Sequence, residues 1–224
     1  MFSSDGLTKK ALATREAIRA AALESFRTRG YDATTLRLIA ADARVSLGNT
    51  YNYFPTKHHL VQELYLEATG AFHEQAATRL EGVSGLVDRL RTAYRLGLEV
   101  LEPYHALASG FVTAAVTPDS PVNPLSSESS DAREQAVAVW RLVVDGARDS
   151  LPAWLATRLP DVLQLGYLLV SLFWVYDRSP EHRRTLAVLD SGLALFRLGL
   201  PVLRTPLVRG PLERLLVALT EVAA

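Results

Sequence analysis

The stretch from Thr34 to Lys57, TTLRLIAADARVSLGNTYNYFPTK, constrains the fold of this chain more than any other. Apolar residues recur at helical spacing after two threonines, a residue type that caps helix N-termini. This pattern breaks, and Ser46 then provides a second cap. The helix after Ser46 has room for about two and a half turns before Pro55 ends it. The stretch therefore predicts two short helices joined by a turn of about three residues, a helix-turn-helix.

The side chains of the second of these helices suit contacts with DNA. Gly48 lets the backbone approach a DNA strand closely, and the amides of Asn49 and Asn52 can read base edges or hold phosphates. The alternative is a helical hairpin whose tyrosines only pack, but Tyr and Asn are costly on a bare surface. We predict a DNA-binding surface made of Thr35, Arg37, Ser46, Leu47, Gly48, Asn49, Tyr51, Asn52, Tyr53 and Lys57.

Together with the helix before it, this stretch resembles the DNA-binding domain of the tetracycline-repressor (TetR) family of bacterial transcription regulators. The matching residues are Ile18, Ala22, Phe26, Gly30, Tyr31, Thr34, Thr35, Ile39, Ala40, Val45, Ser46, Gly48, Tyr51, Tyr53, Phe54, Lys57 and Leu60. The resemblance implies that Tyr53 and Lys57 contact DNA phosphates. Arg44 stands where the family usually has a turn glycine, so the turn must accommodate a side chain. Thr50 stands where Leu or Ile is common, so this helix is expected to pack less tightly.

Charge is unevenly distributed along the chain. Lys and Arg together number 24, as do Asp and Glu, so the net charge is zero. Residues 1–60 nevertheless hold nine basic residues against five acidic ones, which leaves the remainder acidic. This asymmetry is typical of a basic DNA-facing module attached to an acidic body.

The composition indicates a soluble cytoplasmic protein. Nearly half of the residues are apolar, which excludes general disorder, and the absence of cysteine excludes disulfides and thiolate metal sites. The first residues lack the apolar core of a secretory signal. The most apolar run, 162–176, contains Gln164 and is shorter than the roughly 20 residues of a membrane span. We therefore expect no membrane contact.

The sequence lacks the motifs of common enzymes. It has no glycine-rich phosphate loop and no nucleophile elbow. His58 and His59 are adjacent, so on a helix they point about 100° apart and cannot easily share a metal ion. His105 and His182 are isolated in the sequence. We predict no catalysis, no cofactor and no metal site.

The predicted fold class is all-α. Residues 1–60 form a three-helix DNA-binding domain, and residues 61–224 form a helical domain that binds an effector and dimerises. One helix from Lys57 towards Leu80 joins the two as a stiff connector. The body is predicted to be helical over 86–102, 103–116, 131–150, 161–177, 180–200 and 211–222, with a mobile loop at 117–131 and a turn at 152–160.

Residues 1–13 are predicted to form a flexible arm. Lys9 and Lys10 in this arm could reach the minor groove of DNA, although a solvated tail is the simpler interpretation. The first helix is predicted to run from a cap at Thr14 to Arg29, where a glycine ends it.

Two late helices are predicted to form a homodimer interface. Residues 161–177 are apolar all round, and within 180–200 four leucines and Phe196 are spaced 3, 4, 3, 4 like a coiled-coil seam. A seam within one chain is the alternative. The family resemblance implies that two late helices pair with their copies as a four-helix bundle. The predicted interface residues are Leu165, Leu169, Leu186, Leu189, Leu193, Phe196 and Leu200.

Aromatic residues in the body suggest a binding pocket. An apolar cavity for a small effector is one interpretation, and ordinary core packing is the other, because sequence does not separate them. The candidate lining residues are Tyr94, Phe111, Trp140, Tyr167 and Trp174.

These observations predict a homodimeric repressor that binds a palindromic operator in double-stranded DNA and is released by a small apolar or amphipathic ligand. The alternative is an effector-independent member of the same fold that organises DNA or binds proteins.

Overall fold

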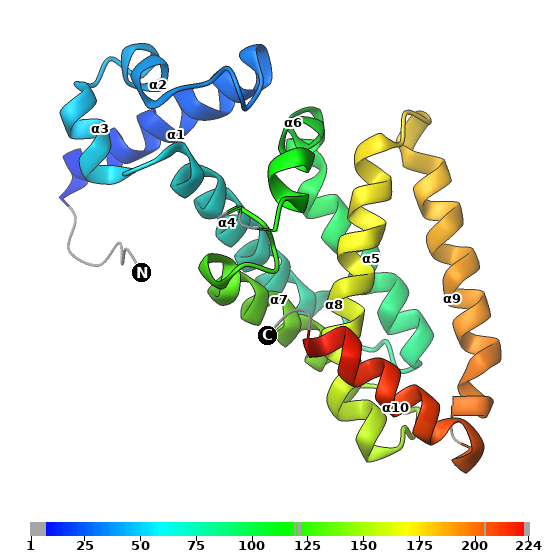
Figure 1. The fold of residues 1–224 in the computed structure, drawn as a ribbon. Helices are drawn as coiled ribbons and strands as arrows, with labels where there is room; N and C mark the ends of the chain where they lie inside the picture. Colours follow the sequence, from blue (N-terminus) through cyan, green and yellow to red (C-terminus); the bar gives the residue numbers. More distant parts are fainter. Residues whose placement is uncertain (1–7, 119, 121, 204, 222–224) are drawn as a thin grey trace.

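The computed structural model describes residues 8–118, 120, 122–203 and 205–221, and these contain helices but no strands (Figure 1). The all-α prediction is therefore confirmed. The α-helices are α1 Lys9–Arg29, α2 Leu36–Asp42, α3 Leu47–Tyr53, α4 Lys57–Arg79, α5 Leu86–Leu101, α6 His105–Val116, α7 Ser130–Asp145, α8 Ala153–Tyr176, α9 Arg183–Leu203 and α10 Pro206–Glu221. Short 3-10 helices span Glu102–Tyr104, Ser127–Ser129 and Pro180–His182.

The first helix begins earlier than predicted. α1 starts after a cap at Thr8, whose side-chain oxygen accepts a backbone N–H of the first turn at 3.2 Å. The predicted cap at Thr14 is wrong, because the Thr14 hydroxyl lies inside the helix and donates to Lys10 O at 2.9 Å. Lys9 and Lys10 are therefore helical and exposed. The rest of the predicted arm, residues 1–7, lies outside the described residues.

α8 is longer than predicted. The predicted turn between Pro152 and Pro160 is wrong, because the helix begins at Ala153 and continues through Pro160. Leu155, Leu159 and Leu163 recur one turn apart and are all buried. The free energy gained by burying this stripe compensates for the backbone hydrogen bond that a proline inside a helix removes.

Two helical segments are long and apolar enough to cross a membrane by length and composition alone: Ala153–Tyr176 and Pro180–Leu203. The argument that the apolar run is too short for a span is therefore wrong. The core helix of a soluble protein passes the same test, but only 17% of the most apolar window of the second segment is buried in this chain. Most of the apolar segment that contains α9 is therefore not buried by the rest of this chain.

The turn of the helix-turn-helix is a Schellman motif. Val45 N donates to Ala40 O at 2.9 Å, and Arg44 N donates to Ala41 O at 3.1 Å. Arg44 has φ 56°, the left-handed conformation for which glycine is usual. The turn therefore accommodates a side chain, at a cost of about 1–2 kcal/mol. α3 starts at the Ser46 cap, as predicted.

The DNA-binding domain has its own small core. Ile18, Ala22 and Phe26 lie one turn apart on α1 and are almost completely buried. Ile39 of α2 joins them with no exposed surface. Thr50 of α3 is fully buried despite its small size, and its hydroxyl donates to the backbone carbonyl one turn earlier at 3.1 Å.

Two helices attach this domain to the body. α4 contributes Leu60 to the core of the DNA-binding domain and Phe72 to the core of the body. α6 makes the second attachment through Phe111, whose ring lies 5.3 Å from Phe26 and 5.2 Å from Tyr31. Phe111 was predicted to line a pocket in the body, and this is wrong because its ring packs on the DNA-binding domain instead.

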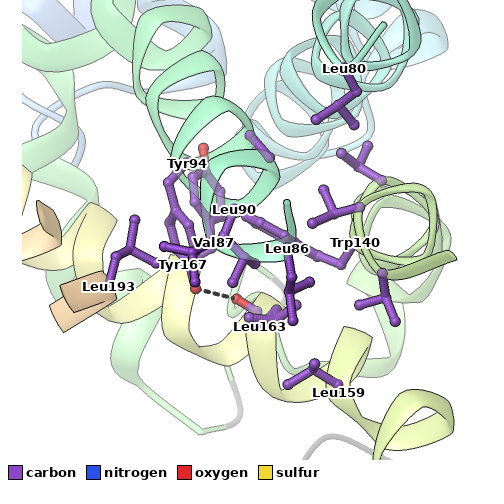
Figure 2. Close-up of a cluster of buried hydrophobic side chains, with 14 of the residues drawn as sticks. Leu80, Leu86, Val87, Leu90, Tyr94, Trp140, Leu159, Leu163, Tyr167 and Leu193 are labelled. Atoms are coloured by element: carbon purple, nitrogen blue, oxygen red, sulfur yellow. Dashed lines mark hydrogen bonds between the residues drawn. The ribbon is translucent and has the colours of Figure 1, made fainter. Parts of the chain in front are cut away.

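The core of the body lies between α4, α5, α7 and α8. Tyr94 of α5, Trp140 of α7 and Tyr167 of α8 point towards one another there (Figure 2). The Trp140 ring lies 4.7 Å from Tyr94 and 5.8 Å from Tyr167. The Tyr94 hydroxyl donates to Leu163 O at 3.2 Å, and the Tyr167 hydroxyl donates to Gly97 O at 3.0 Å. Aromatic rings thus fill this core, and the hydroxyls of both tyrosines have backbone hydrogen-bond partners.

The regular leucine seam of α9 faces the interior of the same chain. Leu189, Leu193 and Leu200 are buried in the core of the body, and Phe196 packs against it. Leu186 packs against a neighbouring cluster that contains Trp174. The seam is therefore intramolecular, and its assignment to the dimer interface is wrong for the three buried leucines.

Candidate DNA-binding surface and interior site

α3 presents one face to the outside of the molecule. Gly48, Tyr51 and Asn52 are exposed on it, and half of the Tyr51 surface is accessible (50%). At the start of α2, Thr35 and Arg37 are also exposed. The remaining predicted residues of α3 are partly buried: Leu47, Asn49 and Tyr53.

Nothing inside the protein requires a glycine at position 48. A Cβ added to Gly48 would meet no atom within 4 Å, and the residue has an ordinary helical conformation. Glycine weakens a helix relative to alanine by roughly 0.5–1 kcal/mol. Packing inside the protein does not explain why this loss of helix stability is tolerated. A close approach of another molecule to the backbone at Gly48 would explain it, which supports the DNA-binding interpretation of this face.

Lys57 already has partners within the protein. Its ammonium donates to three carbonyls of the loop between α1 and α2: Tyr31 O at 2.8 Å, Asp32 O at 3.3 Å and Thr34 O at 3.2 Å. It also lies 4.3 Å from the centre of the Tyr31 ring. Lys57 thus holds this loop against the start of α4. Its contact with a DNA phosphate stays a prediction, and a phosphate would compete with these carbonyls.

The neighbouring histidine is part of the same junction. The Tyr31 hydroxyl and His58 Nδ1 form a hydrogen bond. Burial lowers the pKa of His58 from its ordinary value, and the charge of Lys57 lowers it further. Burial also raises the pKa of Tyr31 to about 12. Both shifts favour the uncharged forms of the two groups that this hydrogen bond joins.

Only three of the five predicted pocket residues come together. Tyr94, Trp140 and Tyr167 share the core of the body, whereas Phe111 packs on the DNA-binding domain. Trp174 is buried in a separate cluster, where its ring lies 4.4 Å from His105. The prediction of one aromatic pocket lined by all five residues is therefore wrong. Periodicity identifies the inner face of a helix but not the neighbour that the face meets.

Sequence reasoning missed a set of buried polar atoms in the body. The Tyr65 hydroxyl, the Ser171 hydroxyl and Gln164 Nε2 are buried and make no hydrogen bond among the described residues. Gln164 Oε1 accepts from Trp140 Nε1 at 2.8 Å, so only its amide nitrogen is unpaired. Ser171 follows Tyr167 by one helical turn in a strongly apolar helix, and this polar interruption is the signal that the sequence offered.

A second missed feature is an exposed apolar face on α8 and α9. Its members are large apolar side chains with exposed fractions between 37% and 75%: Leu169, Leu172, Phe173 and Tyr176 of α8, and Val188, Leu195, Leu198 and Val202 of α9. Leu169 was predicted at the interface and is exposed, while Leu165 is half-buried. We call these eight residues the α8–α9 face. Its signal in the sequence is a second apolar stripe on α9, opposite the leucine seam.

Comparison with known proteins agrees with this arrangement. The family model "Bacterial regulatory proteins, tetR family" matches residues 18–64, and the model "Tetracyclin repressor-like, C-terminal domain" matches residues 89–201. The uncharacterized HTH-type transcriptional regulator YuxN of Bacillus subtilis (strain 168) is 35% identical over 80 residues, which is 36% of this chain and 26% of YuxN. The match thus spans about a quarter of the length of that relative.

Solved structures share the fold over most of the chain. A TetR-family transcriptional regulator from Syntrophomonas wolfei has a TM-score of 0.65 and 17% identity, and the match covers 84% of this chain and 97% of that one. Thermus thermophilus FadR, a TetR-family repressor solved in complex with lauroyl-CoA, has a TM-score of 0.58 and 24% identity, covering 80% and 93%. At these identities the likeness shows the fold alone.

Proposed function

This chain belongs to the tetracycline-repressor (TetR) family of bacterial transcription regulators, whose members bind DNA, and we propose that it is a homodimeric repressor of transcription. It binds a palindromic operator and is released by a small apolar or amphipathic ligand. The family consists of regulators rather than enzymes. The protein acts in the cytoplasm, where its operator lies.

The outward face of α3 carries this proposal. Gly48 has open space around it, and the exposed side chains beside it, Tyr51 and Asn52, are not needed for the core of the domain. The second helix of a helix-turn-helix lies in the major groove, where amides can bond to adenine edges. A surface of this kind is explained by contact with DNA.

The experiment is selection of duplexes from a random library, followed by titration of the selected duplex with the full chain. Asn52→Ala should weaken binding and relax the preference at one base position per half-site, by about 1–3 kcal/mol if the amide bonds in a bidentate manner. Gln75→Ala removes an exposed amide from α4 and serves as the matched control. A parent chain that selects no sequence would contradict the proposal.

The α8–α9 face supports the homodimer. Large apolar side chains exposed together on two neighbouring helices mark an interaction site, and a helix-turn-helix protein needs two copies to read two half-sites. A second copy of the same face is self-complementary under two-fold symmetry. The partner copy would also account for the small buried share of α9.

Release by a ligand is supported by the linkage between body and DNA-binding domain through α4, whose two ends belong to two different cores. Thermus thermophilus FadR, which has this fold, binds lauroyl-CoA. We infer by this likeness that the body of the present chain accepts an amphipathic molecule. Titration with such molecules, with operator binding as the readout, tests this.

The effector-independent alternative has one observation in its favour. Tyr94, Trp140 and Tyr167 fill the middle of the body, and the hydroxyls of both tyrosines are already paired. A regulator that needs no ligand would have a core of this kind. It would bind its operator with the same affinity in the presence of every candidate effector.

A further inference from the structure

Two buried hydroxyl groups in the body have no hydrogen-bond partner among the described residues. They belong to Tyr65 of α4 and Ser171 of α8. The hydroxyls of Tyr94 and Tyr167, in the same body, both donate to backbone carbonyls. Because a buried polar group without a partner is costly, native proteins pair nearly all of them. These two hydroxyls, one on α4 and one on α8, therefore require an explanation.

The helix geometry places Tyr65 and Ser171 on the same side of one aromatic stack in the body. Phe72 of α4 and Tyr167 of α8 stack with ring centroids 5.8 Å apart and an interplanar angle of 18°. Tyr65 precedes Phe72 by about two turns, and Ser171 follows Tyr167 by about one turn. α4 runs away from the DNA-binding domain and α8 runs back towards it (Figure 1). Both hydroxyls are therefore displaced from the stack in one direction, towards the DNA-binding domain.

The electrostatic surroundings show the same proximity. Burial is the main cause that raises the pKa of Tyr167, and both Ser171 and Tyr65 lie near enough to shift this pKa, in opposite directions. Burial raises the pKa of Tyr65 to about 12, and the charge of Arg133 opposes this rise. Tyr65 therefore stays protonated and can donate, and the charge of Arg133 acts on it. One nitrogen of Arg133 donates to Pro124 O and to Ser126 O, at 3.1 Å in each case, which fixes this charge at the start of α7.

We propose that Tyr65 and Ser171, with the charge of Arg133, hold the head group of a carboxylate-bearing effector. The inference rests on the proposed release by a small ligand and adds the chemical class of that ligand. Two hydroxyl donors and a guanidinium match the acceptor oxygens of a carboxylate. An uncharged apolar head would leave both hydroxyls unpaired, and a cationic head would meet the charge of Arg133. The site lies at the end of the body nearest to the DNA-binding domain.

The stability of the ligand-free protein gives the first test. Tyr65→Phe removes an unpaired buried hydroxyl, so it should raise the midpoint of thermal unfolding by about 2–4 °C. Tyr94→Phe is the matched control, because it removes a hydroxyl that is paired with Leu163 O and should lower the midpoint. If Tyr65→Phe lowers the midpoint as Tyr94→Phe does, the Tyr65 hydroxyl has a partner such as a buried water, and the proposal is overturned.

Ligand binding gives the second test. Decanoate and 1-decanol have the same chain and differ in the head group, so titration of the full chain with each, followed by tryptophan emission, isolates the contribution of the carboxylate. The parent should bind decanoate at least about ten-fold more tightly than decanol, because hydrogen bonds to a charged group are strong. Tyr65→Phe and Ser171→Ala should each reduce this preference about ten-fold and weaken decanol binding less, because the neutral hydroxyl of decanol makes weaker hydrogen bonds than a carboxylate.

Failure of this inference and failure of the proposed function give different results. Carboxylate binding that depends on Tyr65 but leaves operator affinity unchanged supports the site and contradicts release by this ligand. Release of the operator by a neutral compound, to the same extent in the parent and in Tyr65→Phe, supports release and overturns the carboxylate site. A series of carboxylates from hexanoate to tetradecanoate in which none binds also overturns it.

Discussion

Gly97 of α5 and Tyr167 of α8 occupy complementary positions in the body: a Cβ added to Gly97 would lie 2.6 Å from Cε2 of the Tyr167 ring. The same tyrosine donates its hydroxyl proton to Gly97 O at 3.0 Å. A reciprocal pair lies beside it, since a Cβ on Gly166 would lie 2.8 Å from the hydroxyl oxygen of Tyr94. Each helix thus offers a glycine to a tyrosine of the other, which brings α5 and α8 close together.

Gly97→Ala should therefore destabilise the protein. The added methyl group displaces a buried ring and breaks its hydrogen bond, and overpacking of this kind costs about 1–3 kcal/mol. Denaturant unfolding of the full chain measures the change. Gly70→Ala in α4 is the control, because its Cβ meets no atom within 4 Å and alanine is the better helix former. Equal stability of the two variants would show that Tyr167 moves aside freely.

Gly48→Ala should separate stability from DNA binding. Because nothing surrounds a Cβ at this position, alanine should stabilise α3 by roughly 0.5–1 kcal/mol. The same methyl group should weaken operator binding if the backbone of α3 approaches DNA closely. Thermal unfolding and operator titration on one preparation measure both effects. If the variant is more stable and binds the operator as tightly as the parent, the backbone of α3 does not approach DNA closely at Gly48.

Charges placed on the two sides of α9 should have opposite effects. Leu195 belongs to the α8–α9 face with 70% of its surface exposed, whereas Leu193 is buried in the core of the body. Leu195→Glu should give a folded monomer, and Leu193→Glu should unfold the protein because it buries an unpaired charge. Sedimentation combined with circular dichroism distinguishes the two outcomes.

Val116→Glu is the control for this pair, because Val116 is equally apolar and 59% exposed but lies on α6. It should leave the dimer intact. A parent chain that sediments as a monomer would contradict the dimer and would direct attention to another occupant of the α8–α9 face, such as lipid.

Stability should decrease on mild acidification. The folded state lowers the pKa of His58, mainly through burial, so the unfolded state binds more protons near the ordinary value of about 6.5. The stabilisation is therefore complete above about pH 6.5 and is lost as the pH falls towards the lowered pKa. His58→Gln keeps an acceptor for Tyr31 and should flatten this dependence. His73→Gln, at an exposed position of the same helix, should retain it.

Local signals in the sequence were sufficient for the helix-turn-helix. Thr35 and Ser46 accept backbone N–H groups at 3.3 Å and 3.2 Å, so the caps that predicted the two helices are present. The cap signal alone did not locate the start of α1, because Thr8 and Thr14 are both threonines and either could cap a helix. The structure shows that Thr8 is the cap. Local chemistry thus predicts that a helix exists better than where it begins.

The candidate sites were harder to predict because they depend on which helices meet. α9 has apolar residues on two opposite sides. The regular spacing on one side favoured it as the dimer interface, but Leu193 on that side faces the interior of the chain. Phe111 and Trp174 have the same apolar character as Trp140, yet each lies in a different cluster. Unpaired hydroxyls such as that of Tyr65 are invisible until the neighbouring helices are in place.

The double attachment of the DNA-binding domain has a mechanical consequence. A body joined to another at a single point can swing in any direction, whereas one joined at two separate points can turn only about the line that connects them. Leu60 of α4 and Phe111 of α6 define such a pair of points. As long as the ring of Phe111 stays against Phe26 and Tyr31, this contact restricts how the domain can turn on the body. In the proposed dimer, the same contact would limit how the distance between the two recognition helices can change.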